Sequence, residues 1–454
     1  MPEAFEQEHA HEQLTEINRA ISRGMFVRVR NLLHEMPTAD VAFILESTPA
    51  KERNLLWQLI DNDFHGEILE ELSEDVRNGI IQKMNPAMLA EATEGMDTDD
   101  LAEVLRSLPN DTYQEVLNSL DSQDRVRAEK ALAYADGTAG AIMNTDTVTL
   151  RADVSTEVVM RYLRLRGQLP EATDVLYVVD DDDKLIGELP LSTLVVTANP
   201  ATLVADIMDQ DAETIRDSMD ESDVAQLFER HNWISAPVVD EDNHLLGRIT
   251  IDDVVDIIRE DAEHSMMSMA GLDDEEDTFA PVLKSTQRRS VWLGINLLTA
   301  LMAAAVSSMF EDILGQLAVL AVLNTIVPSM GGIAGNQTLT LVIRAMALGH
   351  VAPTNVRWLI VKEFTIGVLN GLLWAVLLAT VVAIWKQDLM LGGVIAFAML
   401  MNMLAAGIAG VTIPLILKRL DIDPALAGGV ILTTVTDVVG IFAFLGTATW
   451  LLAS

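Results

Sequence analysis

The stretch from residue 285 to residue 454 is almost continuously apolar, and it constrains the fold more than any other feature. It carries 8 Lys/Arg and 7 Asp/Glu, whereas residues 1–284 carry 22 and 61. An apolar segment of about 20 residues spans a bilayer as a helix. We therefore expect a polytopic α-helical domain that anchors an acidic N-terminal part to the lipid bilayer. Its five predicted spans are residues 291–310, 316–346, 360–385, 391–417 and 426–452.

Lys and Arg gather in the loops on one side of these spans, and an excess of both marks the cytoplasmic side. The acidic N-terminal part is therefore predicted to be cytoplasmic. An odd number of spans places the C-terminus outside, and residues 1–20 show no signal peptide. The basic loop residues are Arg288, Arg289, Arg344, Arg357, Lys362, Lys418 and Arg419.

Composition excludes several classes of function. The chain has no cysteine, which excludes disulfides, thiolate metal sites and cysteine nucleophiles. A net charge of -38 repels phosphate backbones, so no nucleic-acid partner is expected. Neither a nucleophile–base pair nor a phosphate-binding loop is visible, and we predict that the chain is not an enzyme.

The second predicted span contains the sequence PSMGGIAGNQ at residues 328–337, which combines helix breakers with two amides. Irregular backbone at membrane depth is tolerated only where it is buried in protein or lines a water-filled cavity. We therefore expect unwound backbone beside a cavity here. The alternative is that the small residues serve helix packing, which does not account for the amides.

Asp437 lies near the middle of the fifth predicted span. An ionised Asp at that depth costs roughly 2.5–3.5 kcal/mol on insertion scales. No basic residue lies at the same depth in the other spans, so an internal ion pair is not expected. The alternatives are a protonated carboxyl or one hydrogen-bonded to Thr433 or Asn336. The favoured interpretation is a cation site on a conduction path.

The donor types around Asp437 restrict the ion. Carboxylate, amide and hydroxyl oxygens are hard ligands that suit Mg, Ca or Mn. Magnesium keeps several of its waters, so a few protein oxygens can hold it. Because one Asp per chain cannot complete a shell, a homodimer with two-fold symmetry is predicted to surround one hydrated divalent cation. The predicted pore ligands are Asp437, Thr436, Thr433 and Asn336.

A repeat of twelve residues runs through the first part of the chain. Each unit opens with a mostly apolar residue followed by a turn or N-cap type, and then a short amphipathic segment. A unit of twelve fits one short helix plus a turn, and stacked units share a continuous core. Residues 1–135 are therefore predicted to form an all-α superhelix. The units begin at residues 36, 48, 60, 72, 84, 96, 108 and 120.

The pattern then changes to short strands and helices that occur twice. VVDDDDKLIG at residues 178–187 matches VVDEDNHLLG at 238–247, and each follows a predicted helix and strand. Such a tandem is expected to bury a sheet between its copies. The predicted domains are 136–198 and 199–261, a connecting helix at 262–289 and the membrane domain at 290–454.

The second copy resembles a cystathionine-β-synthase (CBS) domain, through PVVD at residues 237–240 and LGRITIDD at 246–253. In that family the positions of Thr250 and Asp253 often contact the ribose of an adenine nucleotide such as ATP. Trp233 either stacks on the base or belongs to the core. The first copy lacks the Asp, so the resemblance implies at most one nucleotide site.

The whole chain resembles the MgtE-type magnesium channels and transporters. The order of domains matches, as do GGIAGNQ at residues 331–337, DPALA at 423–427 and TTVTD at 433–437. The resemblance implies a homodimer in the bacterial inner membrane, with a pore lined by spans two and five and Asp437 as the central ligand. Mg²⁺ would be both substrate and regulator. Ile333 stands where members commonly have Asn, so no selectivity role is carried over to it.

Acidic residues crowd the helix that leaves the second CBS copy. Asp253, Asp256 and Glu260 are spaced i, i+3, i+7 and share one face, and a second acidic run occupies residues 273–277. The resemblance implies that Mg²⁺ draws such faces together and closes the pore. The alternative is a solvated acidic surface. The predicted regulatory ligands are Asp99, Asp100, Asp220, Asp253, Asp256, Glu260 and Asp261.

Two other functions stay open on the sequence alone. One is a cation-coupled secondary transporter, although five spans with one break do not divide into the duplicated halves typical of that class. The other is a membrane-tethered nucleotide sensor that transports nothing. The residues do not select among Mg, Mn, Co and Ca.

Overall fold

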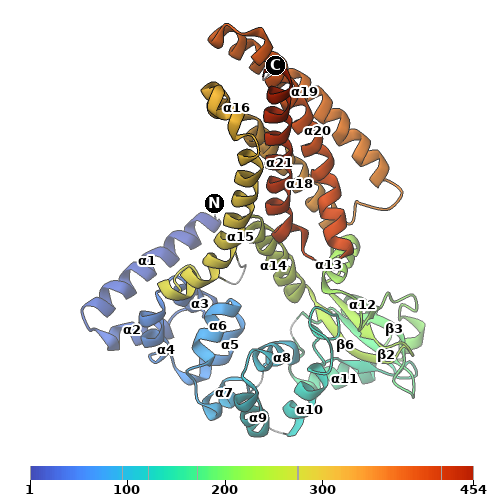
Figure 1. The fold of residues 1–454 in the computed structure, drawn as a ribbon. Helices are drawn as coiled ribbons and strands as arrows, with labels where there is room; N and C mark the ends of the chain where they lie inside the picture. Colours follow the sequence, from blue (N-terminus) through green and yellow to red (C-terminus); the bar gives the residue numbers. More distant parts are fainter. Residues whose placement is uncertain are drawn as a thin grey trace. The chain divides into compact units, whose positions relative to one another are not determined.

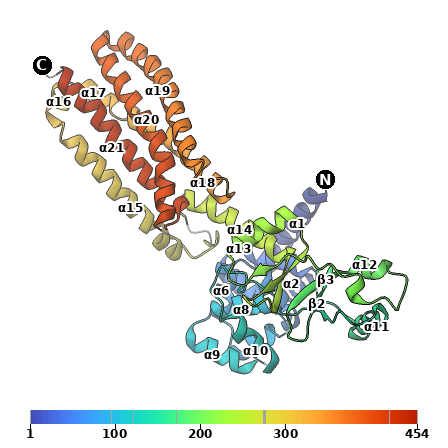
Figure 2. The ribbon, with the colours of Figure 1, turned by 90° about the vertical axis from the view of Figure 1, so that its right-hand side faces the viewer.

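The computed structural model describes residues 2–94, 96–120, 122–170, 172–272, 276–420 and 422–452. The chain divides into two compact units. The first comprises Met1–Glu263 and Glu275–Pro281, and it holds the helical domain and the CBS pair. The second comprises His264–Asp274 and Val282–Ser454, and it holds the membrane helices (Figures 1 and 2).

The twelve-residue repeat of the first unit is confirmed. After α1 (Pro2–Ser22) and α2 (Phe26–His34), a helix begins at residues 38, 50, 62, 74, 86, 98, 110 and 122. These helices make up the blue to cyan part of the ribbon in Figure 1. They are α3 (Thr38–Glu46), α4 (Ala50–Trp57), η1 (Asn62–Phe64) continued by α5 (His65–Glu70), α6 (Glu74–Ile81), α7 (Pro86–Ala92), α8 (Thr98–Arg106), α9 (Asn110–Ser119) and α10 (Ser122–Ala131).

The repeat folds this way because each unit supplies its own helix start and its own contribution to the core. Pro, Ser, Asp or Asn precedes each helix, and the Asn85 side chain accepts a hydrogen bond from the Met88 amide at 2.8 Å. Leu45, Leu69 and Leu105 are fully buried and belong to one continuous apolar core that runs through the repeat.

The two CBS copies have the same topology. Each holds a three-stranded sheet, in which the first strand pairs parallel and the third antiparallel to the middle strand. The register shifts at the same place in both, after Val178 and after Val238. The elements are β1 (Thr149–Leu150), α11 (Thr156–Arg166), β2 (Val175–Val179), β3 (Leu185–Pro190) and α12 (Leu191–Val196), then η2 (Val204–Asp206), β4 (Ile215–Arg216), α13 (Glu221–His231), β5 (Ser235–Val239), β6 (Leu245–Thr250) and α14 (Ile251–Met269).

The internal duplication is thus confirmed, but the prediction of one sheet between the copies was wrong. Two separate sheets form, because each copy pairs its own strands in sequence. The sheets meet through buried residues, and the Tyr177 hydroxyl lies 3.2 Å from Ser235 Oγ.

The connecting helix predicted over residues 262–289 was also wrong. The helix α14 ends at Met269, and Gly271, with a φ of 69°, turns the chain away from the helical path. The next helix begins at Val282 directly after Pro281, and it continues without a break through the first span. Residues 270–272 and 276–281 are not helical.

Among the residues that the structure describes, five helices of the second unit are long and apolar enough to span a membrane, as predicted. The fourth is the centre of the bundle, since 61% of its apolar window is buried. The elements are α15 (Val282–Ser308), α16 (Glu311–Gln316), α17 (Ala318–Leu323), α18 (Ile326–Ala347), α19 (Val356–Lys386), α20 (Leu389–Arg419) and α21 (Pro424–Leu452).

The second span is broken, but not at the predicted place. The break falls at residues 324–325, between α17 and α18, and residues 328–337 are helical. Pro328 lies in the first turn of α18, where its missing N–H is not needed. A Cβ added at Gly331 would lie 2.1 Å from Asn402 Nδ2, and one at Gly335 would lie 3.0 Å from Leu432. The glycines therefore serve close helix packing.

Candidate functional site

Asp437 lies on α21, half-buried, within the fifth span. Within the part of the chain that the structure describes, its carboxylate has no hydrogen-bond or ion-pair partner. The predicted alternative of a hydrogen bond to Thr433 or Asn336 is therefore not the arrangement found. The Thr433 hydroxyl instead donates to the Gly429 carbonyl at 2.9 Å.

Two of the other predicted pore residues, Thr433 and Asn336, are exposed on α21 and α18. Thr433 is exposed one turn before Asp437 on α21. Asn336 is exposed on α18, and its Oδ1 lies 4.0 Å from where a Cβ of Gly429 would be. We call Asn336, Thr433 and Asp437 the polar face. Ile333 is 56% exposed on α18, one turn before Asn336.

Thr436 lies apart from the polar face. Its side chain is fully buried, and its hydroxyl donates to the Thr433 carbonyl at 3.0 Å. A Cβ added at Gly332 would lie 3.7 Å from that hydroxyl, so Thr436 faces α18 within the bundle.

Among the described residues of the bundle, Thr338, Glu363 and Asn402 are buried and polar, and the sequence did not predict them as site residues. Glu363 on α19 is 4% exposed; it accepts a hydrogen bond from Thr338 Oγ1 at 3.0 Å and pairs with Lys362 at 3.2 Å. Asn402 on α20 is fully buried and donates to the Val327 carbonyl at 2.7 Å. An ionisable residue in an apolar span is a signal for Glu363, whereas nothing in the sequence singles out Asn402.

In the first unit, five of the predicted regulatory residues line one cavity of about 500 Å³, which we call the acidic cavity. Asp99 and Asp100 come from α8, and Asp253, Asp256 and Glu260 come from α14, so the superhelix and the second CBS copy supply opposite walls. Other acids on its wall are Glu70, Glu74, Glu103, Asp136 and Glu221.

Three arginines also line the acidic cavity, but each is paired with one of its acids. Arg106 lies 2.7 Å from Asp136, Arg259 lies 3.1 Å from Asp256, and Arg77 pairs with Glu103. Asp99, Asp100 and Asp253, which also line the wall, form no ion pair with these arginines. Among the residues that the structure describes, no three His, Asp or Glu side chains are placed to chelate a metal ion directly.

Burial and mutual repulsion raise the pKa values of these acids. Burial, helped by Glu70 and Asp253, raises the pKa of Asp100 to about 8. Burial raises the pKa of Asp253 to about 6 and, together with Glu103, raises the pKa of Glu260 to about 7. The pKa of Asp99 is raised well above its ordinary value by burial and by Asp253. Carboxyl groups whose pKa values are raised by burial and by neighbouring negative charges can bind either protons or cations, since both reduce the repulsion.

Asp220 and Asp261 lie outside the acidic cavity. Both are exposed; Asp220 caps α13 by accepting from the Ser222 amide at 3.0 Å, and Ser222 Oγ donates to Asp261 at 3.2 Å. The cavity is lined instead by Glu221, whose pKa is raised by burial and by Asp220. Glu221 was not predicted, because the sequence does not show that Glu221 rather than its neighbour Asp220 lines the cavity.

The CBS motif residues lie together. Thr250 donates to Asp253 Oδ2 from its hydroxyl at 2.8 Å and from its amide at 3.1 Å. Trp233 is stacked on His231, with ring centroids 4.8 Å apart, and meets Phe228 edge-on at 5.5 Å. One ring face of Trp233 is therefore already covered by protein.

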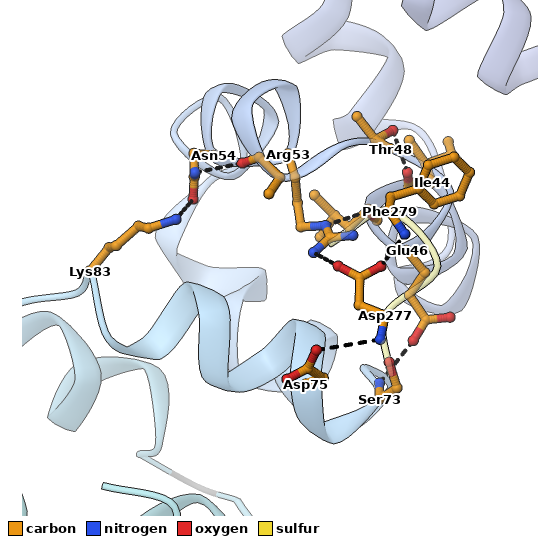
Figure 3. Close-up of polar contacts among 12 residues, drawn as sticks. Ile44, Glu46, Thr48, Arg53, Asn54, Ser73, Asp75, Lys83, Asp277 and Phe279 are labelled. Atoms are coloured by element: carbon orange, nitrogen blue, oxygen red, sulfur yellow. Dashed lines mark hydrogen bonds and ion pairs between the residues drawn. The ribbon is translucent and has the colours of Figure 1, made fainter. Parts of the chain in front are cut away.

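A buried ion pair fastens residues 276–281, which we call the strap, to the superhelix. Figure 3 shows Asp277 of the strap pointing at Arg53 of α4. Arg53 Nη1 lies 2.8 Å from Asp277 Oδ2, and the two side chains are 5% and 6% exposed. Arg53 Nε also donates to the Leu45 carbonyl at 2.8 Å, and Asp277 Oδ1 accepts from the Phe279 amide at 2.8 Å. The strap directly precedes the first membrane helix in the chain.

Comparison with known proteins agrees with this arrangement of domains. Residues 36–137 match the MgtE intracellular N domain, residues 139–196 and 204–260 match the CBS domain, and residues 324–447 match MgtE, described as a divalent cation transporter. A crystal structure of the cytosolic domain of the Mg²⁺ channel MgtE in complex with ATP is 29% identical, with a TM-score of 0.50, and covers 54% of this chain and 99% of that chain.

Relatives extend over nearly the full length. The magnesium transporter MgtE of Enterococcus faecalis is 32% identical, covering 98% of this chain and 98% of its own. That of Bacillus subtilis is 30% identical, covering 92% and 93%. The prediction that the chain is not an enzyme is confirmed, because these relatives are transporters. The chain belongs to the MgtE family of multi-pass membrane transport proteins.

Proposed function

We propose that two copies of this chain form a magnesium channel of the bacterial inner membrane, in which α18 and α21 of each copy line the pore. The observation that carries the proposal is the carboxylate of Asp437, which lies within a membrane helix without a partner among the described residues. A charge at that depth is tolerated where it faces a water-filled path. The relatives named above are magnesium transporters, and the oxygen donors of the polar face are those that magnesium prefers.

The exposure of the polar face supports a dimer. Thr433 and Asn336 are exposed on a single chain, so a lipid-facing position would leave both with apolar surroundings. A second copy related by a two-fold axis would bring a second Asp437 to the same ion. Two carboxylates balance one divalent cation, which can keep its inner waters. Thr436, buried against α18, would support the polar face rather than contact the ion.

The acidic cavity is proposed as the regulatory site. Bound Mg²⁺ would neutralise the facing acids of α8 and α14, which holds the superhelix against the second CBS copy and closes the pore. Asp220 and Asp261 would contribute from the edge of this region, through the contact that both make with Ser222. The acidic N-terminal part would be cytoplasmic and the C-terminus outside, in accordance with the loop charges.

An adenine nucleotide is proposed as a second regulator at Thr250 and Asp253. The support is the CBS match and the relative whose cytosolic domain was crystallised with ATP. Trp233 is left out of this site, because its ring packs on His231 and Phe228.

Flux into liposomes tests the channel against its two alternatives. The full chain is expected to carry Mg²⁺ down an imposed membrane potential, at the same rate with and without a proton gradient. A requirement for the proton gradient would favour a coupled transporter instead. Binding of ATP without any Mg²⁺ flux would favour a nucleotide sensor.

The raised pKa values of the acidic cavity predict how stability depends on pH. The folded chain binds more protons than the unfolded chain between about pH 4 and pH 8, so the cytosolic part is stabilised at low pH and loses stability as pH rises through this range. Without Mg²⁺, we expect its melting temperature to fall by at least about 4 °C from pH 5.5 to 8.5.

Saturating Mg²⁺ should flatten that pH profile, because the cation replaces the protons. The double variant Asp100→Asn/Glu260→Gln should flatten it without Mg²⁺, and the exposed control Asp63→Asn should keep the wild-type slope. A slope that Mg²⁺ leaves unchanged would contradict the assignment. The measurement is thermal unfolding of the full chain in detergent, with a chelator or with Mg²⁺.

A further inference from the structure

Asn402 sits where three membrane helices meet. It is fully buried in α20, the most enclosed of the five spans, and its Nδ2 donates to the Val327 carbonyl of α18 at 2.7 Å. A carbonyl has two lone pairs, so Val327 can accept this bond in addition to a helical one. The amide therefore ties the centre of the bundle to the first turn of α18.

Two glycines make room for this amide. A Cβ added at Gly331 of α18 would lie 2.1 Å from Asn402 Nδ2, and one added at Gly440 of α21 would lie 2.9 Å from the same atom. The Gly440 position also lies 3.2 Å from Pro328 Cα, so α18 and α21 approach each other closely here. The Asn402 side chain thus fills a slot whose walls are the two helices that carry the polar face.

The slot lies one turn from Asp437. Gly440 follows Asp437 by three residues on α21, and Gly331 precedes Asn336 by five residues on α18. A change in the separation of α18 and α21 at the slot would therefore move Asp437 relative to Asn336. Asn402 itself is enclosed by protein and lies within the bundle rather than on the polar face.

An amide is a costly way to fill this space. Asn402 Oδ1 has no hydrogen-bond donor within the described part of the chain, and a buried acceptor without a donor is destabilising. A leucine has the same branching and no polar atoms, so it would serve packing at least as well. The bond from Nδ2 to Val327 is the feature that leucine cannot supply.

We propose that Asn402 is a positioning residue for ion selectivity: its bond to Val327, in the slot formed by Gly331 and Gly440, sets the spacing of α18 and α21 at Asp437. The inference rests on the proposed channel function and adds to it a residue that does not touch the ion. A group that hydrogen-bonds directly to a metal ligand typically contributes 10- to 100-fold to metal affinity or activity. Asn402 acts on the ligand through the two helices, so we expect the lower end of that range.

The test compares Asn402→Leu with Asn370→Leu, the same change at an exposed position of α19. We expect Asn402→Leu to lower the ratio of Mg²⁺ to Ca²⁺ flux by roughly tenfold, while its melting temperature is at least that of the wild type. Asn370→Leu should leave the ratio unchanged. A wild-type ratio in Asn402→Leu, in a preparation where Asp437→Asn blocks flux, would overturn this inference alone. Absence of flux in the wild type would overturn the proposed function.

A second pair of variants tests the positioning role of Asn402 if Asn402→Leu does not fold. Gly331→Ala should displace the amide and lower the flux ratio in the same way. In Gly331→Ala/Asn402→Ala the shorter side chain at position 402 leaves room for the new methyl group. The ratio of Mg²⁺ to Ca²⁺ flux in the double variant should therefore be no lower than in Asn402→Ala alone. Fully additive effects of the two changes would overturn the proposal.

Discussion

Asp437→Asn is expected to reduce Mg²⁺ flux into liposomes by roughly 100-fold or more. Asparagine keeps the shape of the side chain and removes its charge. The variant removes one charge from each copy of the proposed dimer. Losing even one charge at a partly buried divalent site costs about 3 kcal/mol, and each 1.4 kcal/mol is a factor of ten, so roughly 100-fold is the smallest loss expected. The measurement is dye-reported Mg²⁺ uptake at a fixed membrane potential, with equal amounts of reconstituted protein.

The matched control is Asp388→Asn. Asp388 caps α20 by accepting from the Met390 amide at 2.8 Å and the Leu391 amide at 3.1 Å. Asparagine is an equally good cap, so both flux and stability should stay near those of the wild type. Equal flux in Asp437→Asn and the wild type would remove Asp437 from the conduction path.

Arg53→Met is expected to release the strap from the superhelix. The substitution leaves the Asp277 carboxylate buried without its cation, and breaking a buried ion pair from one side typically costs 3–5 kcal/mol. The Asp277 amide donates to Asp75, and the Phe279 amide donates to Asp277. Hydrogen exchange at both amides should therefore accelerate by roughly 100-fold or more.

Two further variants test whether the unpaired charge of Asp277 causes the faster exchange. Arg53→Met/Asp277→Asn removes both charges and keeps an acceptor for the Phe279 amide, so it should restore much of the protection. Lys83→Met breaks the exposed contact of Lys83 with Asn54, also seen in Figure 3, and should change exchange in the strap little. Faster exchange in Lys83→Met than in Arg53→Met would contradict the role given to the ion pair.

Features set by local sequence were the ones predicted well. The helical repeat was predictable because each unit of twelve residues carries its own helix start, such as Asn85, and its own apolar positions. The five spans were predictable because the bilayer sets a length and a polarity. The grouping of Asp253, Asp256 and Glu260 on one face follows from helical spacing alone.

Features set by packing between distant segments were not predictable from the sequence. The glycines near Pro328 were predicted to break the helix. Instead, side chains of α20 and α21 occupy the space beside Gly331 and Gly335. Asp277 was interpreted as part of a repelling acidic run, yet Arg53, far away in the sequence, neutralises it. Residues 273–275 of that run lie outside the described residues.

The candidate site residues also differ in whether local sequence or packing between distant segments determines them. Asp437 was found because a charge in an apolar span has a cost that the sequence alone reveals. The placement of Asp99 and Asp100 opposite α14 was predicted only through the family resemblance, since no spacing rule joins α8 to α14. Asn402 was not predicted, because an uncharged amide in a span does not by itself indicate a function. Its environment, formed by glycines of two other helices, is set by packing.

A density map of the full chain with Mn²⁺, which scatters anomalously and shares the ligand preferences of Mg²⁺, would show whether Asp437 holds the permeating ion. We expect a dimer with one ion on its two-fold axis, roughly 4 Å from both Asp437 carboxylates, because a hydrated ion keeps water between itself and the protein. An Asp437 side chain that faces lipid, or an ion held elsewhere in the membrane with Asp437 distant from it, would contradict the proposed pore.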